Sequence, residues 1–110
     1  MRTLVGFLLA SGFALFNSIG YAMDDDAAKA LLKEHNCVKC HAPEKEKLGP
    51  SLKQIATKRA GQGDAEAILV KAMQSTDNVK LTDGTEGAHK ALDIKDPAIL
   101  RDVARWILNR

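Results

Sequence analysis

The stretch Cys37-Val38-Lys39-Cys40-His41 decides how the rest of this chain is organised. Two cysteines separated by two residues and followed directly by histidine form the attachment motif of c-type haem. On one helical turn, each thiol can add to a haem vinyl group, which forms two thioethers. The backbone then carries His41 beneath the macrocycle, where an imidazole nitrogen binds iron. The motif therefore predicts one covalently attached haem c with His41 as an iron ligand.

Three other interpretations of the cysteine pair are less consistent with its surroundings. A thioredoxin-like redox pair is found in a βαβ context, whereas the flanking residues have a helical pattern. A structural zinc site normally needs four ligands, and the chain has no second cysteine pair. A disulfide between Cys37 and Cys40 would close a tight, strained ring. Haem attachment is the interpretation that uses all three side chains.

The N-terminal segment has the pattern of a secretory signal peptide. It begins with Met1-Arg2, continues through an apolar run at residues 4–10, and ends with small residues in Gly20-Tyr21-Ala22. A membrane anchor is the alternative, but polar residues at 11–12 and 17–18 interrupt the run, which is short for a span. We expect a signal peptide over residues 1–22 and a mature periplasmic domain over residues 23–110.

Composition limits the possible functions of the mature domain. The chain has 16 Lys and Arg residues and 14 Asp and Glu residues, and only Arg2 of the basic set falls in the expected signal peptide. This near balance gives no support for nucleic-acid binding. A domain of this size is close to the limit at which a polypeptide core alone is marginal. A covalently held haem would fill its centre.

Helical periodicity appears in four segments of the mature chain. The expected inward faces are Ala28, Leu31, Leu32 and His35; Leu52, Ile55 and Ala56; Ala65, Ile68, Leu69, Ala72 and Met73; and Ile99, Val103, Trp106 and Ile107. The expected start signals are the acidic run at residues 24–26, a capping box at Ser51 to Gln54, an Asp64 cap, and Asp96 before Pro97. No segment shows the alternation of a strand, so the predicted fold is all-α.

The order of these features resembles the small class I cytochromes c of bacteria over nearly all of the mature chain. The resemblance depends on the haem motif, the Leu48-Gly49-Pro50-Ser51-Leu52 piece and a C-terminal helix with Trp106. It implies about four helices wrapped around one covalently attached haem, in an electron carrier rather than an enzyme. It also implies that the carbonyl of Pro50 accepts a hydrogen bond from His41, a contact that fixes the ring and tunes the iron.

The sixth iron ligand is where the chain departs from the family. Members usually place a Met-Pro pair in the loop before the last helix, but no Met follows Met73. Residues 76–95 show no helical period and suggest a functional loop. His89 lies in this loop at about the position of the family's Met. We predict bis-His ligation by His41 and His89, with Met73 or an open site as the alternatives.

These inferences predict a periplasmic, monomeric electron carrier that exchanges single electrons with redox partner proteins. The predicted haem-binding residues are Cys37, Cys40, His41, Pro50 and His89, and the predicted iron ligands are His41 and His89. No stable membrane association is expected after signal cleavage. Two alternatives remain, namely a haem protein with a displaceable sixth ligand that acts as a small-molecule sensor or enzyme, and a redox subunit of a larger enzyme. Basic residues between 33 and 59 suggest steering of an acidic partner, although an ordinary solvated surface is the simpler interpretation.

Overall fold

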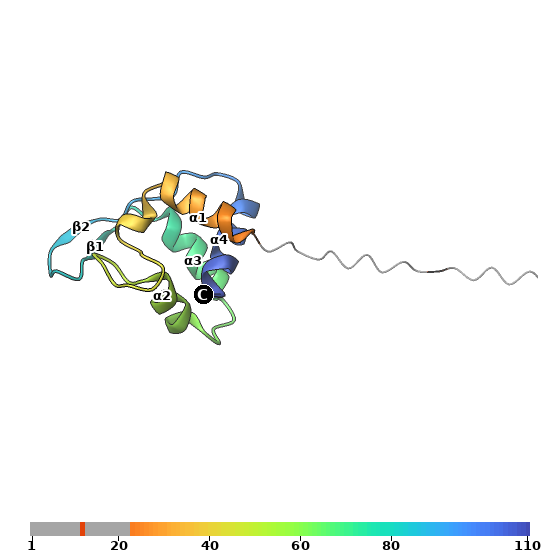
Figure 1. The fold of residues 1–110 in the computed structure, drawn as a ribbon, viewed down its shortest axis with the longest axis horizontal. Helices are drawn as coiled ribbons and strands as arrows, with labels where there is room; N and C mark the ends of the chain where they lie inside the picture. Colours follow the sequence, from red (N-terminus) through yellow and green to blue (C-terminus); the bar gives the residue numbers. More distant parts are fainter. Residues whose placement is uncertain (1–11, 13–22) are drawn as a thin grey trace, which may run out of the picture.

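The computed structural model describes residue 12 and residues 23–110, and the predicted signal peptide otherwise lies outside the described residues. Its helices are α1 (Asp25–Glu34), a 3-10 turn (Cys37–Lys39), α2 (Leu52–Arg59), α3 (Ala65–Gln74) and α4 (Pro97–Leu108). Two short strands, β1 (Asn78–Lys80) and β2 (Glu86–Ala88), form a hairpin that projects from the helices (Figure 1). The all-α fold class is confirmed, with this small hairpin as an addition.

Helix α4 is the centre of the helical packing, because it contacts α1, α2 and α3. Its buried side chains include Leu100, Val103, Trp106 and Ile107. Of these, Val103, Trp106 and Ile107 join one apolar cluster with Ala28, Leu32, Leu52 and Leu69 from the other three helices. The predicted inward faces of the four helices therefore supply most of the core. Leu100 is an addition that the expected period did not include.

A polar junction holds the start of α1 against the end of α4. The indole N–H of Trp106 donates to Asp25 Oδ1 over 2.7 Å, and this bond holds the pKa of Asp25 below its usual value. The Arg110 guanidinium stacks 4.1 Å from the centre of the Trp106 ring and also contacts Asp25 Oδ1 at 2.9 Å. Trp106 therefore buries its ring in the core and pairs its one donor at the surface.

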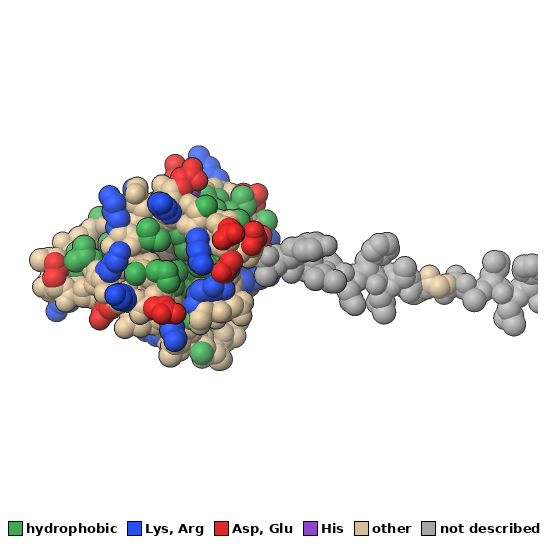
Figure 2. All heavy atoms as spheres, in the orientation of Figure 1, with side chains coloured by type: hydrophobic (Ala, Val, Ile, Leu, Met, Phe, Trp, Pro, Cys, Tyr) green, Lys and Arg blue, Asp and Glu red, His purple; other side chains and the backbone are tan. Residues whose placement is uncertain are grey.

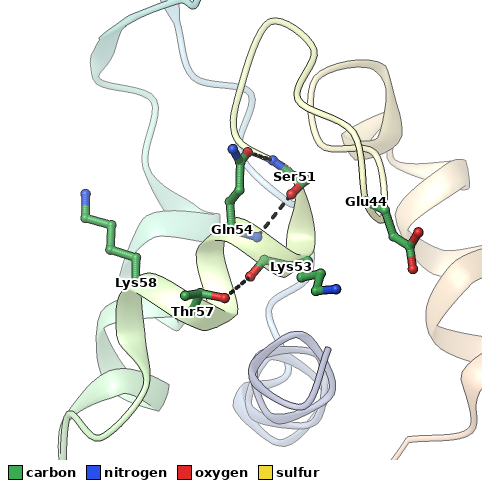
Figure 3. A pocket seen from close by; sticks show the side chains of 6 residues that line it. All are labelled: Glu44, Ser51, Lys53, Gln54, Thr57 and Lys58. Atoms are coloured by element: carbon green, nitrogen blue, oxygen red, sulfur yellow. Dashed lines mark hydrogen bonds between the residues drawn. The ribbon is translucent and has the colours of Figure 1, made fainter.

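Helix α2 begins with the predicted capping box. The Ser51 hydroxyl accepts from the Gln54 amide over 3.0 Å, and the Gln54 side chain accepts from the Ser51 amide over 2.7 Å (Figure 3). These two bonds satisfy amides that the first turn of a helix leaves without partners. Asp96 likewise accepts from the Ala98 amide at the start of α4, where Pro97 is the first helical residue.

The predicted Asp64 cap of α3 is wrong in one respect. Asp64 occupies the N-cap position, but its side chain makes no capping hydrogen bond. Its backbone angles, φ −103° and ψ 12°, differ from the extended conformation in which a cap side chain reaches the first free amides. Helix α3 therefore starts without a side-chain cap, although the position of its start was predicted.

The hairpin was not predicted, because its strands are only three residues long and contain a single large apolar side chain. Asn78 pairs with Ala88 and Lys80 with Glu86 in an antiparallel register. Its turn contains Gly84 at φ +86°, a conformation that glycine adopts without strain. The pair Asp83-Gly84 is a turn signal in the sequence. It is the local feature of the sequence that agrees with this hairpin.

The two helix starts give a matched test of the capping box. We expect Ser51→Ala to lower the free energy of unfolding by about 1 kcal/mol, because it removes a buried cap hydroxyl. Asp64→Ala removes a cap-position carboxylate without a capping bond, so its effect should stay below about 0.5 kcal/mol. Guanidinium denaturation of the two holoproteins compares them. Equal losses would contradict the assigned role of Ser51.

Candidate haem-binding site

The 3-10 turn gathers the cysteines and His41. The amides of Cys40 and His41 both donate to the Cys37 carbonyl, over 3.3 and 2.9 Å, which keeps the motif within a single tight turn. Both thiols are free and half-buried. Burial raises the pKa of the Cys37 thiol, and the positive charge of Lys90 opposes this shift. The turn thus presents two thiols and an imidazole to the same side of the chain.

The His41 ring is fixed by the segment that leads into α2. Its Nδ1 lies 2.7 Å from the Pro50 carbonyl oxygen. Since a carbonyl only accepts, Nδ1 carries the proton and Nε2 keeps its lone pair. Gly49 lies against the ring, and a Cβ at this position would come within 2.9 Å of His41 Cε1. The contact with Pro50 that the resemblance implied is present, and Gly49 allows the close approach that it requires.

His89 reaches the same region from the end of the hairpin. Its backbone amide donates to the Asp77 carbonyl over 2.9 Å, which extends the strand ladder by one step. Its Nδ1 lies 2.8 Å from the Ser75 carbonyl oxygen. The proton of this ring is therefore also on Nδ1, and Nε2 keeps its lone pair. The loop position of His89 was predicted, whereas its hydrogen-bond partner was not.

The two imidazole rings face each other across one cavity. Their centroids are 6.3 Å apart, and their planes are inclined by 53°. The cavity has a volume of about 490 Å³, which is within the usual range of cofactor sites. All predicted site residues line it, and so does the alternative ligand Met73. The structure thus brings together residues that are far apart in the sequence.

The walls of the cavity are mostly apolar. Helices α1 to α4 contribute side chains that include Leu32, Ile55, Leu69 and Ile107. The hairpin contributes Val79, which sequence reasoning missed because it did not predict the strand. Among the described residues, the exposed large apolar side chains are Leu48 and Val79, and both line this cavity. Its charged lining residues are all basic, namely Lys58, Arg59, Lys80 and Lys90.

A second hollow lies over the start of α2, and its uncharged polar side chains are already hydrogen-bonded (Figure 3). Ser51 and Gln54 bind each other in the capping box, and the Thr57 hydroxyl donates to the Lys53 carbonyl over 2.9 Å. In contrast, the large cavity holds two imidazole nitrogens with available lone pairs. The chemistry of the protein therefore lies in the large cavity.

Charges of both signs cover the face of the domain drawn in Figure 2. Lys and Arg side chains lie around a central group of hydrophobic side chains, with acidic side chains between them. A surface of this kind has no large field of one sign. On this face, the basic residues are therefore interpreted as part of an ordinary solvated surface rather than as an extended basic patch.

Comparisons with known proteins agree with this fold and site. The family model described as Cytochrome c matches residues 26–110. Cytochrome c-551 of Pseudomonas aeruginosa is 31% identical over 107 residues, which cover 94% of this chain and 91% of the relative. The crystal structure of Class 1 cytochrome MtoD from Sideroxydans lithotrophicus ES-1 is 44% identical, with a TM-score of 0.74. It covers 80% of this chain and 97% of its own.

Cytochrome c552 of Nitrosomonas europaea is a further structural neighbour, with a TM-score of 0.58 and 29% identity over 73% of this chain and 95% of its own. The fold and site define a small class I haem protein. The chain belongs to the cytochrome c family. It is accordingly an electron carrier rather than an enzyme, and it holds one covalently attached haem c, with Cys37 and Cys40 fitting the attachment motif.

The contact between Gly49 and His41 can be tested by asking how closely the backbone at Gly49 packs against the imidazole ring. Gly49→Ala places a methyl group within 2.9 Å of the imidazole, so we expect a loss of about 1–3 kcal/mol in the free energy of unfolding. Gly63→Ala is the control, because a Cβ there meets no atom within 4 Å. Denaturation of the holoproteins measures both. A Gly49→Ala protein as stable as the control would show that the approach is not tight.

Proposed function

We propose that the chain is a periplasmic one-electron carrier whose haem iron is bound by His41 on one side and His89 on the other. The observation that carries this proposal is the pair of imidazole rings that face each other in one cavity, with centroids 6.3 Å apart. Both rings present Nε2 as the available nitrogen, because each Nδ1 is paired with a backbone carbonyl.

The residues of the cavity fit a haem c. A metal ion bound by one nitrogen of each ring, at about 2 Å as for zinc, would separate the ring centroids by about 6 Å. The observed separation agrees with this value. Two free thiols lie beside His41 for the two thioethers. The apolar walls suit a macrocycle, and the exposed Leu48 and Val79 side chains would cover its faces.

Each residue then has a defined task. Bound haem supplies a one-electron ferric–ferrous couple. Cys37 and Cys40 hold it covalently, and the hydrogen bonds from His41 to Pro50 and from His89 to Ser75 orient the rings and raise their basicity. Two fixed nitrogen ligands leave little geometric change between oxidation states, which favours fast electron exchange over binding of small molecules.

The signal pattern in residues 1–22 supports a periplasmic location, and the thioether chemistry of the motif suits a secreted protein. None of the helices within residues 23–110 has the length and apolarity that a membrane crossing requires. The proposed partners are redox proteins that dock at the cavity edge. Monomeric behaviour is part of the same proposal.

His89→Ala tests the sixth ligand directly. We expect a high-spin ferric spectrum and new affinity for carbon monoxide in the reduced protein, because the distal nitrogen is removed. Met73→Leu is the control. It is close in volume and should leave the low-spin spectrum unchanged, with a cost below about 1.5 kcal/mol in stability. Optical and EPR spectra distinguish the two variants.

The opposite result, a high-spin Met73→Leu protein and a low-spin His89→Ala protein, would transfer the ligand to Met73. The wild-type near-infrared spectrum gives an independent test, because bis-imidazole iron lacks the charge-transfer band of ferric haem with Met ligation. The reduction potential should also be lower than that of a comparable Met-ligated protein, since thioether ligation raises it.

Single cysteine variants test the covalent attachment. Cys37→Ala and Cys40→Ala should each retain at most one thioether, so that the pyridine haemochrome spectrum shifts and the yield of holoprotein falls. The mass of each purified protein and its pyridine haemochrome spectrum measure this. Variants whose spectrum and haem content equal those of the wild type would exclude the proposed attachment.

A further inference from the structure

The imidazole of His89, the proposed distal iron ligand, is held by the turn at the end of α3. A side chain within this turn makes a further hydrogen bond that holds the turn itself. Residues 89–92 run beside residues 73–77. The Leu92 amide donates to the Met73 carbonyl over 2.7 Å, and the His89 amide donates to the Asp77 carbonyl over 2.9 Å. The carbonyl of Ser75, halfway between these two acceptors, accepts from His89 Nδ1 over 2.8 Å.

The strand register explains why a side chain, the His89 imidazole, donates to the Ser75 carbonyl. Asn78 pairs with Ala88, so Asp77 and then Ser75 would be the next acceptors if the ladder continued. An extended antiparallel ladder would offer a backbone amide to the Ser75 carbonyl. The ladder stops at His89, and its imidazole takes that place instead. The ring is therefore positioned by the same segment that positions its backbone.

The Ser75 hydroxyl stabilises this segment. Its Oγ accepts from the Asp77 amide over 3.1 Å, a local bond in which a serine side chain imitates a backbone turn. Ser75 also ends α3 in an extended conformation, with ψ 139°. The hydroxyl thus fixes the relative orientation of two peptide groups, and the carbonyls of both residues hold His89.

We propose that Ser75 is the positioning residue for the distal iron ligand. Through its bond to the Asp77 amide it aims the Ser75 carbonyl at His89 Nδ1, which keeps Nε2 directed into the cavity. This inference rests on the proposed ligation by His89. A partner on the second ring nitrogen both orients a metal-bound histidine and raises its basicity, and its loss typically weakens metal binding about 10–100-fold.

The test compares Ser75→Ala with Thr76→Ala in the ferric holoprotein, with cyanide as the probe. Thr76 is exposed, and its side chain makes no hydrogen bond within the described residues. Cyanide must displace His89 to bind iron, so Ser75→Ala should raise the cyanide affinity about tenfold. Its reduction potential should rise, because a less basic ligand stabilises the ferric state less. Thr76→Ala should match the wild type in both measurements.

Rescue variants separate positioning from a general loss of structure. Ser75→Thr keeps the hydroxyl, and Ser75→Asn offers another acceptor to the amide two residues later. Both should restore the wild-type cyanide affinity and low-spin EPR signal. Equal cyanide affinities for Ser75→Ala and Thr76→Ala would overturn the inference. So would a failure of both rescue variants.

His89→Ala, measured in the same series, separates the two proposals. A high-spin His89→Ala protein together with an unaffected Ser75→Ala protein would retain His89 as the ligand and remove the role of Ser75. A low-spin His89→Ala protein would instead overturn the ligation on which the inference rests.

Discussion

Two imidazole rings at a fixed separation are the constraint on which the rest of this structure depends. His41 and His89 belong to segments that are far apart in the chain, yet their centroids lie 6.3 Å apart in one cavity. Each ring donates from Nδ1 to a carbonyl that belongs to a helix boundary, Pro50 before α2 and Ser75 after α3. The positions of these two helix ends therefore set the distance between the rings. Because α4 packs against both helices, the central helix holds this distance constant.

Much of the fold could be predicted because its signals are local. The five residues from Cys37 to His41 carry the haem chemistry within one turn, and the capping box from Ser51 to Gln54 needs only four consecutive residues. The apolar period of α4 predicted Val103, Trp106 and Ile107 as core residues, and all three are buried. In each case the chemistry needs side chains close together in the sequence, so that spacing alone predicts the contact.

The remaining features depend on where distant segments return. The Ser75 carbonyl becomes the partner of His89 only because the chain folds back in a hairpin, and nothing in either local sequence specifies that pair. The place of Gly49 under the His41 ring is likewise a consequence of two segments meeting in space. Asp64 shows that a local signal can also predict a contact that does not form. It is a suitable residue at the N-cap position, but it makes no capping hydrogen bond because its backbone is not extended. Local chemistry identifies candidates, and tertiary packing decides which of them are used.

The two sides of the cavity differ in how firmly they are held. Near His41, the residues Ala42, Ser51 and Leu52 are buried, and the neighbouring Cys37 and Cys40 fit the motif that attaches haem covalently. His89 follows a hairpin whose strand residues are mostly exposed. Thr82 joins the hairpin tip to the proximal loop through its amide and its hydroxyl, which donate to the Leu48 and Lys47 carbonyls. Segments with little buried apolar surface open at a lower free-energy cost than packed helices. The hairpin is therefore expected to open at a lower free-energy cost than the helices, and the Thr82 and Ser75 contacts oppose that opening.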